Sequence, residues 1–66
     1  MTLLPKAPLV RIMKKAGGVR VSPDAVDAFG DVLEEIGIEV ARKSVELAAF
    51  AKRSTVRKED VKLATQ

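Results

Sequence analysis

The stretch SPDAVDAFGDVLEEIGIEVARKSVELAAFA, residues 22–51, decides the fold of this chain. Its start is well marked, because Ser22 is a favoured helix N-cap, Pro23 suits the first helical position, and Asp24 suits the positive end of the helix dipole. Nothing interrupts the helical pattern before about Ala51. The sequence therefore predicts one helix of roughly 29 residues, which is about 43 Å long at about 1.5 Å per residue.

This predicted helix is apolar on two sides. One stripe keeps spacings of three and four residues, apart from the insertion of Ser44, and consists of Val26, Phe29, Leu33, Ile36, Val40, Leu47 and Ala51. The second consists of Ala25, Ala28, Val32, Ala41, Val45 and Ala48. A helix that is apolar on two sides must be covered on two sides. Because the rest of the chain offers only short segments, we expect a second copy of the long helix to supply the cover, in a dimer interface made of Phe29, Leu33, Ile36, Gly37, Val40 and Leu47.

Two glycines lie inside the same helix. Gly30 and Gly37 each cost on the order of 1 kcal/mol relative to Ala. They are seven residues apart on nearly the same face, and Gly37 is the midpoint of residues 23–51. Two identical helices that cross at a two-fold axis would approach most closely there. The alternative is a helix that tolerates two flexible positions.

Size and composition also favour a dimer. The chain has 66 residues, enough for a single domain over residues 1–66, and has no Cys and no His. Disulfides and structural zinc therefore cannot stabilise it, which leaves oligomerisation as the route to enough buried area. No apolar run approaches the length of a membrane span, and Met1 to Leu4 are followed at once by Pro5 and Lys6 rather than by a signal-peptide core. We expect a soluble intracellular protein with no membrane partner.

Charge is segregated along the chain. Residues 1–20 hold five basic side chains and no acid, residues 21–41 hold six acids and no base, and residues 42–66 hold seven bases and three acids. A small domain with one basic face points to nucleic acid as a partner. The alternative is an uneven, solvated surface.

A first helix is predicted over residues 8–16. Leu9, Ile12, Met13 and Ala16 share one face, and the opposite face carries Arg11, Lys14 and Lys15. Pro8 suits its first turn, and Gly17 suits the left-handed position just past its end. Gly17 and Gly18 open a tight loop, after which Val19, Arg20 and Val21 favour an extended stretch with Arg20 pointing outward.

A second basic loop follows the long helix. Residues 52–57 read KRSTVR and offer Lys52, Ser54, Thr55 and Arg57 as candidate phosphate contacts. The last helix is predicted over residues 58–64, with Glu59 and Asp60 in its first turn as the helix dipole favours. Its N-cap is either Thr55, which has the right chemistry, or Arg57, which fits the placement of the acids better.

The order short helix, arginine-bearing loop, long helix, basic loop, short helix resembles the histone fold. The sequence also resembles archaeal histones along nearly the whole chain, in Pro5-Lys6-Ala7-Pro8, Arg11-Ile12-Met13-Lys14-Lys15-Ala16-Gly17, Arg20-Val21-Ser22, Leu33-Glu34-Glu35 and Lys58-Glu59-Asp60-Val61. The resemblance implies an all-α histone fold in an intertwined head-to-tail dimer. In such a dimer the long helices cross, and the first loop of one chain lies beside the second loop of its partner.

The resemblance further implies a chromatin or nucleoid protein that binds, bends and compacts double-stranded DNA without reading its sequence. Arg20 would enter the minor groove beside Thr55 of the partner chain, Arg11, Lys14 and Lys15 would face phosphates, and Arg53 and Asp60 would form a buried ion pair. Histone octamers are the established example of minor-groove arginines that make no base-specific contacts. The residues agree with duplex DNA, since both aromatic side chains, Phe29 and Phe50, lie on the long helix and form no platform for single strands.

Two departures from the family pattern bear on assembly. Phe50 stands where the family usually has a His that bonds to an acid of a neighbouring dimer. Lys52-Arg53-Ser54-Thr55 stands where Gly-Arg-Lys-Thr is common. The first change leaves stacking of dimers into tetramers or fibres open, because Phe50 can form an apolar contact between dimers or be buried in the fold.

Other functional classes fit less well. Without His or Cys, neither Ser22 nor Ser44 has a base partner, so we expect no enzyme and no cofactor. Glu34, Glu35 and Glu39 are read as a solvated acidic face rather than a metal site. The main alternative is a histone-fold module that pairs with a different protein and binds DNA weakly or not at all; Arg20, Arg53, Thr55 and the acid-free first twenty residues favour DNA. The pairing partner is an identical chain or a paralogue, and we expect the protein on the chromosome in the cytoplasm.

Overall fold

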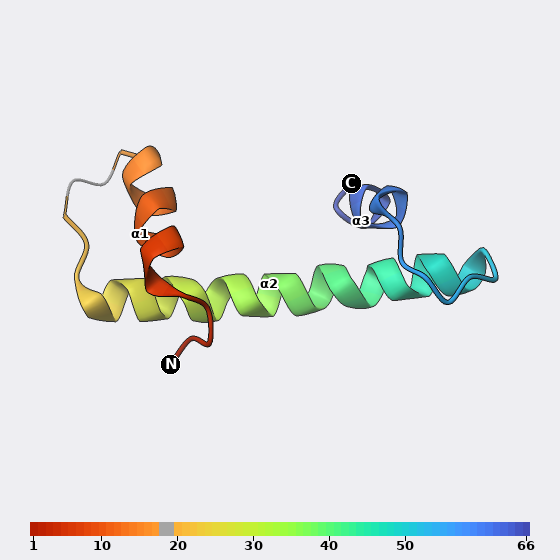
Figure 1. Cartoon of the computed structure of the whole chain (residues 1–66), viewed down its shortest axis with the longest axis horizontal. Helices are drawn as coiled ribbons and strands as arrows, with labels where there is room; N and C mark the ends of the chain where they lie inside the picture. The colour runs from red at the N-terminus through yellow and green to blue at the C-terminus, as the bar shows by residue number, and fades with distance from the viewer. Residues whose placement is uncertain (18–19) are drawn as a thin grey trace. The chain divides into compact units, whose positions relative to one another are not determined.

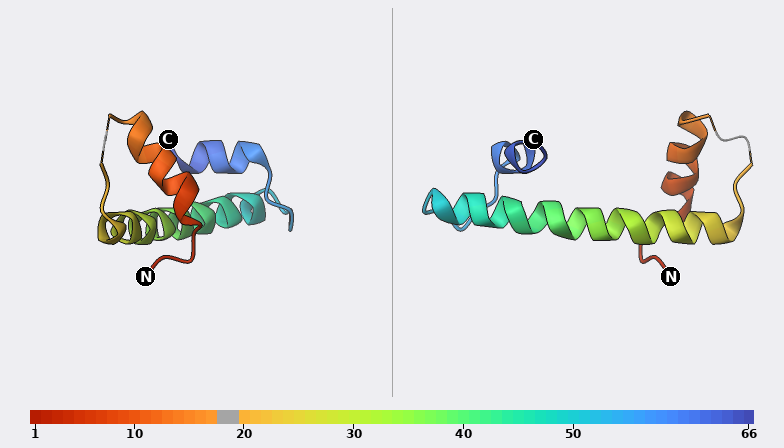
Figure 2. Two further views of the ribbon diagram at one scale, coloured as in Figure 1. Left: turned by 60° about the vertical axis from the view of Figure 1, so that its left-hand side comes forward. Right: turned by 180° about the vertical axis from the view of Figure 1, so that it is seen from behind.

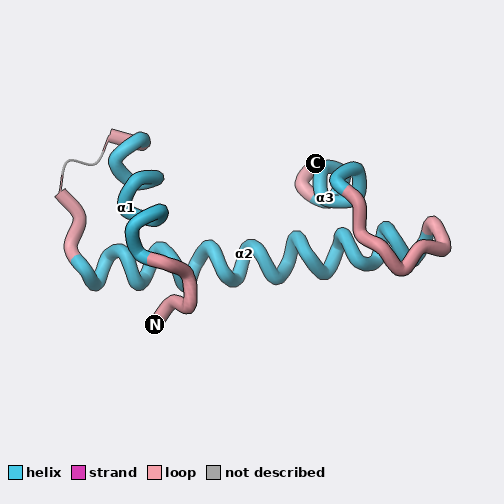
Figure 3. Tube along the Cα trace, viewed as in Figure 1, coloured by secondary structure: helices cyan, strands magenta, loops and turns pink. Residues whose placement is uncertain are grey.

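The computed structural model describes residues 1–17 and 20–66, and the described residues form three helices and no strand. The helices are α1 (Lys6–Lys15), α2 (Pro23–Phe50) and α3 (Lys58–Ala64), joined by the loops drawn in Figures 1 and 3. The prediction of an all-α chain with one long central helix is confirmed. Two compact units are present: an N-terminal unit, Met1–Glu35, and a C-terminal unit, Ile36–Gln66, and α2 contributes to both.

The predicted helix ends are correct for α3 and shifted for the other two helices. α1 begins at Lys6 rather than Pro8 and ends at Lys15 rather than Ala16, and α2 ends at Phe50 rather than Ala51. Pro5 takes the N-cap position of α1, with φ −59° and ψ 139°. Pro8 then lies within the first turn, where its missing N–H removes no intrahelical hydrogen bond. Of the first loop, the expected turn at Gly18 and the extended stretch at Val19 lie outside the described residues.

The helix boundaries beside the first loop have clear local causes. The backbone N–H of Ala25 donates to the Ser22 hydroxyl at 3.1 Å, which confirms Ser22 as the N-cap of α2. At the other side of the loop Gly17 has φ +110°, a conformation that glycine adopts without steric cost. Ser22 therefore caps the start of α2, and Gly17 has a positive φ just past the end of α1, as the sequence predicted.

Among the described residues of the N-terminal unit, Leu9 on α1 and Val26 on α2 are the buried hydrophobic side chains. α1 lies on one side of α2, while residues 1–5 cross α2 toward its other side (Figures 1 and 2). Ile12, Met13 and Ala16 of α1 share one open groove with Ala25 and Phe29 of α2. The small core is therefore continuous with apolar surface that the chain itself does not cover.

The N-terminal segment is attached to α2 by contacts that the sequence did not suggest. The backbone N–H of Leu3 donates to Glu34 Oε1 at 2.7 Å, the Thr2 hydroxyl lies 3.3 Å from the same oxygen, and Lys6 forms an ion pair with Asp27 at 3.7 Å. The expectation of a wholly solvated acidic face is wrong for Glu34. The Glu34 carboxylate instead accepts two hydrogen bonds from the N-terminal segment.

Gly30 is explained by the same segment. It is buried, and a Cβ atom built on it would collide with the side chain of Thr2. At Gly37, in contrast, a Cβ atom would meet nothing within 4 Å in the described residues apart from its chain neighbours and the surrounding helix backbone. Gly30 therefore leaves room for the Thr2 side chain, whereas no comparable contact is present at Gly37.

The C-terminal unit has a partly polar interior. Ser44 and Ala48 of α2 are buried, as is Asp60 of α3. The Ser44 hydroxyl donates to the carbonyl of Val40 at 2.8 Å, so its burial leaves no unpaired donor. α3 lies beside the last turns of α2 (Figures 1 and 2), with the loop at residues 51–57 between them.

Candidate functional site

Arg53 and Asp60 form a two-pronged ion pair in the second loop. Arg53 Nη1 donates to Asp60 Oδ2 and Nη2 donates to Oδ1, each at 2.9 Å, and Nη1 also donates to the carbonyl of Thr55 at 2.9 Å. Asp60 is only 5 % exposed. Two parallel hydrogen bonds fix the orientation of both side chains. The pair therefore ties the loop to the first turn of α3.

Asp60 also caps the N-terminus of α3. Arg57 is the N-cap, with φ −110° and ψ 165°, and its backbone N–H donates to Asp60 Oδ2 at 2.8 Å. Of the two N-cap candidates the structure selects Arg57. The acid three residues into the helix supplies this bond, as in the acidic half of a capping box. Thr55 is consequently left as an exposed loop residue.

These contacts keep both members of the pair charged. The hydrogen bonds from the Arg53 side chain, and then the backbone N–H of Arg57, lower the pKa of Asp60 to about 2. The hydrogen bond to Asp60 in turn raises the pKa of Arg53 above its ordinary value. Arg53 is thus neutralised within the fold, and the exposed polar side chains of the loop are Lys52, Ser54, Thr55 and Arg57.

The other predicted contact residues lie in the N-terminal unit. Arg11, Lys14 and Lys15 are exposed on α1, and Arg20 is exposed just before α2. Lys14 and Arg20 line the same surface groove together with Val10, Val21 and Ser22. The structure therefore brings the loop arginine and one helix lysine together. Within the described residues Lys6 is the basic side chain of this unit that forms an ion pair with an acidic side chain.

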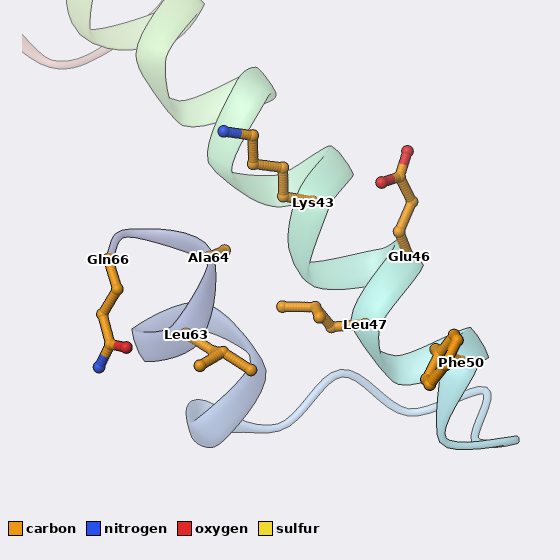
Figure 4. A pocket seen from close by; sticks show the side chains of 7 residues that line it. All are labelled: Lys43, Glu46, Leu47, Phe50, Leu63, Ala64 and Gln66. Atoms are coloured by element: carbon orange, nitrogen blue, oxygen red, sulfur yellow. The ribbon is translucent and has the colours of Figure 1, made fainter.

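Apolar surface remains uncovered in the single chain. Of the predicted dimer residues, Ile36 is 51 % exposed and Gly37 is exposed, while Phe29, Leu33, Val40 and Leu47 are half-buried. In the C-terminal unit an open groove is lined by Leu47, Phe50, Leu63 and Ala64, with Lys43, Glu46 and Gln66 at its edges (Figure 4). Phe50 is 91 % exposed, so it is not buried within its own chain.

Two kinds of site are not found in the described part of the chain. Residues 1–17 and 20–66 contain no group of three or more acidic side chains placed to hold a metal ion. None of the three helices is long and apolar enough to cross a membrane.

Two features of the structure were not predicted from the sequence. Lys52 has a left-handed backbone, with φ +60°, which its side chain does not favour. The signal was its place just after a long helix, where glycine is preferred. The role of Thr2 against Gly30 was also missed, because a glycine inside a helix does not reveal which segment contacts it.

Comparison with known proteins identifies the family. A family model described as histone-like transcription factor (CBF/NF-Y) and archaeal histone matches residues 2–65. The chain is 61 % identical over 64 residues to probable archaeal histone 3 of Methanocaldococcus jannaschii, covering 97 % of this chain and 96 % of that protein. It is 50 % identical over 66 residues to a protein of Thermococcus zilligii named as one subunit of archaeal histone HAN1, covering 100 % and 98 % respectively. With three helices in the order short, long, short, the chain belongs to the family of archaeal histones and has the histone fold.

Proposed function

We propose that this histone binds double-stranded DNA as a dimer, without reading base sequence, and bends and compacts the duplex on the chromosome. The proposal rests on which basic side chains are paired within the fold and which are exposed. Arg53 is neutralised by Asp60 inside the fold, whereas the cations of α1 and of both loop regions remain exposed. Exposed cations neutralise phosphates and release counterions, which gives affinity without sequence preference.

The proposed DNA interface has three parts. Arg20 enters the minor groove with Thr55 of the partner chain beside it, α1 faces phosphates, and the second loop contacts the backbone. The contact residues are Arg11, Lys14, Lys15, Arg20, Lys52, Ser54, Thr55 and Arg57. A dimer presents two pairs of loops and one pair of first helices. A duplex held at three points along a convex surface must bend, and the contacts offset the bending energy.

In the proposed dimer, residues 1–66 of each chain form one histone-fold domain. The two copies of α2 cross. Its interface contains Phe29, Leu33, Ile36, Gly37, Val40 and Leu47. The exposure of Ile36 and the empty space around Gly37 support this assignment, since apolar surface of this extent on a small chain needs a cover.

A second candidate is a module that pairs with a different histone-fold protein and binds DNA weakly. One of the two relatives is named as one subunit of a histone, which favours considering a mixed dimer. Both candidates require the same apolar interface. They differ in whether the exposed cations of the two loop regions bind DNA.

The test is a titration of duplex DNA carrying a fluorophore at each end, at several salt concentrations, with Arg20→Ala as the matched variant. We expect affinity to fall steeply with salt, energy transfer between the ends to rise, and the variant to bind every duplex more weakly to the same degree. A strong preference for one sequence would refute non-specific binding. A folded dimer that fails to bind at low salt would favour the pairing module.

A further inference from the structure

α1 has little apolar packing of its own within the N-terminal unit. Leu9 is its buried residue, whereas Ile12 is 48 % exposed and Met13 is half-buried. A helix of ten residues is not stable through helix propensity alone, so it depends on tertiary contacts. One buried side chain fixes a point on the helix, and a second attachment is needed to fix the direction of the helix axis.

The N-terminal segment, residues 1–5, supplies a second attachment on the other side of α2 (Figures 1 and 2). The N–H of Leu3 donates to Glu34 Oε1 at 2.7 Å, and the Thr2 hydroxyl donates to the same oxygen at 3.3 Å. That hydroxyl also accepts from the N–H of Leu4 at 3.1 Å. One carboxylate of α2 and one hydroxyl of the segment therefore hold two consecutive backbone amides.

The connection from this segment to α1 is short and stiff. Pro5 is the N-cap of α1 with φ −59°, which its ring fixes, and Lys6 is the first residue of the helix. Lys6 Nζ lies 3.7 Å from Asp27 Oδ1, a buried oxygen with no hydrogen-bond partner among the described residues. The start of α1 is therefore attached to α2 both through the segment and through this ion pair.

Gly30 is the strongest indication that the attachment matters. Glycine is one of the least favourable residues inside a helix, so the stability of α2 alone does not explain it. Gly30 is buried, and a Cβ atom on it would collide with the Thr2 side chain. Gly30 and Glu34 are four residues apart and share one face of α2. This face thus provides space for Thr2 at one position and a hydrogen-bond acceptor at the next turn.

We propose that the N-terminal segment positions α1 for DNA binding, with Thr2, Gly30 and Glu34 as positioning residues. The inference rests on the proposed function and deepens it, because these residues act through α1 and contact no phosphate themselves. Cations on a helix whose direction is already fixed lose less conformational freedom when they bind phosphates. The segment therefore raises affinity without adding a phosphate contact.

Three variants disturb the attachment by different routes. Glu34→Ala removes the acceptor, whereas Glu34→Gln removes the charge and keeps an acceptor oxygen. Gly30→Ala displaces Thr2 without any change of charge. Glu35→Ala is the matched control, because it removes an exposed acid at the next position of α2.

Two properties of each variant are measured once its thermal unfolding midpoint shows that it is folded. Hydrogen–deuterium exchange without DNA compares the protection of α1 with that of α3. Titration of a duplex at several salt concentrations gives the affinity and the slope of log affinity against log salt concentration. That slope reports the number of phosphates neutralised.

We expect Glu34→Ala and Gly30→Ala to exchange faster in α1 and at an unchanged rate in α3. Their affinity at a fixed salt concentration should fall on the order of tenfold, with an unchanged salt slope, because the same cations still reach phosphates. Lys14→Ala, which removes a proposed contact, should instead lower the slope. Glu34→Gln should keep most of the affinity, and Glu35→Ala should bind at least as well as the unaltered protein.

Unchanged exchange in α1 of both Glu34→Ala and Gly30→Ala would overturn the proposal and leave the position of α1 to other contacts, including those with a partner chain. Faster exchange with full affinity would also overturn it, because DNA would then orient α1 without the segment. A lower salt slope in these two variants would make the segment part of the contact surface rather than a positioning element. If the unaltered protein fails to bind duplex DNA, the proposed function fails, and the exchange of α1 alone decides whether the segment holds that helix.

Discussion

At the scale of single residues, Asp60 gives the stability of this histone a defined pH dependence. Its pKa is about 2 in the folded chain against an ordinary value of 3.8. A carboxyl whose pKa is lower in the folded state contributes stability that is fully present above the unfolded pKa. That contribution is lost as the pH falls from about 4 to about 2, because the carboxylate that binds Arg53 becomes protonated.

Replacing this carboxylate should remove that part of the pH dependence. We expect Asp60→Asn to lower the denaturant midpoint at neutral pH, because it leaves Arg53 buried in part without its anion. The variant should also show a flatter midpoint between pH 4 and pH 2 than the unaltered chain. Urea unfolding at a series of pH values measures both. A variant whose midpoint declines over this range as steeply as that of the unaltered protein would show that other groups are responsible.

Among single residues, the ion pair of the second loop was predicted, whereas the backbone conformation of Lys52 was not. The resemblance to archaeal histones placed Arg53 and Asp60 together, and the structure contains that ion pair. The left-handed backbone of Lys52 was not predicted, because side-chain chemistry suggested an ordinary loop lysine. Backbone dihedrals at a helix end follow from hydrogen bonding to the preceding turn, which a residue type alone does not reveal.

At the scale of elements, the helix boundaries were predictable where a single signal dominated. Ser22, Pro23 and Asp24 marked the start of α2. Glu59 and Asp60, in the first turn of α3, marked the start of that helix. The start of α1 was misplaced because Pro5 and Pro8 are both compatible with a first turn. The attachment of residues 1–5 to α2 had no periodic pattern at all, so it could not be derived from the sequence.

That attachment predicts an energetic coupling between Thr2 and Gly30. Ala normally stabilises a helix interior by about 1 kcal/mol relative to Gly. In the unaltered chain we expect Gly30→Ala to gain little or nothing, because the new methyl group displaces Thr2 and with it the hydrogen bond from Leu3 to Glu34. In a Thr2→Gly background the same substitution should recover the gain of about 1 kcal/mol.

The coupling is measured by a double-mutant cycle of denaturant unfolding on the four chains. A coupling energy of about 1 kcal/mol is expected for residues in direct contact. Equal effects of Gly30→Ala in the two backgrounds would contradict the close packing of Thr2 on Gly30, and would return Gly30 to the role of a flexible helix position.

At the scale of the whole molecule, the single chain buries few residues fully. Among residues 1–17 and 20–66, the buried apolar side chains are Leu9, Val26 and Ala48, whereas Ile36, Ile38 and Val45 of α2 are more than half exposed. A chain of 66 residues has too little interior to stabilise such a helix alone. The two apolar stripes on α2 predicted this exposed surface from the sequence.

Gly37 provides that experiment, because its surroundings within the chain are empty. Apart from its chain neighbours and the surrounding helix backbone, no atom of the described residues lies within 4 Å of a Cβ at this position, so the chain itself can accept a larger side chain there. If two copies of α2 cross at Gly37, Gly37→Leu will push them apart. We expect this variant to need at least about tenfold more protein to reach the unfolding midpoint of the unaltered dimer, equivalent to about 1.4 kcal/mol.

Glu39→Leu, which places an equally large apolar side chain at a nearby exposed position, is the control and should keep the original concentration dependence. Unfolding midpoints and sedimentation at several protein concentrations give the result. If Gly37→Leu remains as good a dimer as the control, the crossing point lies elsewhere on α2.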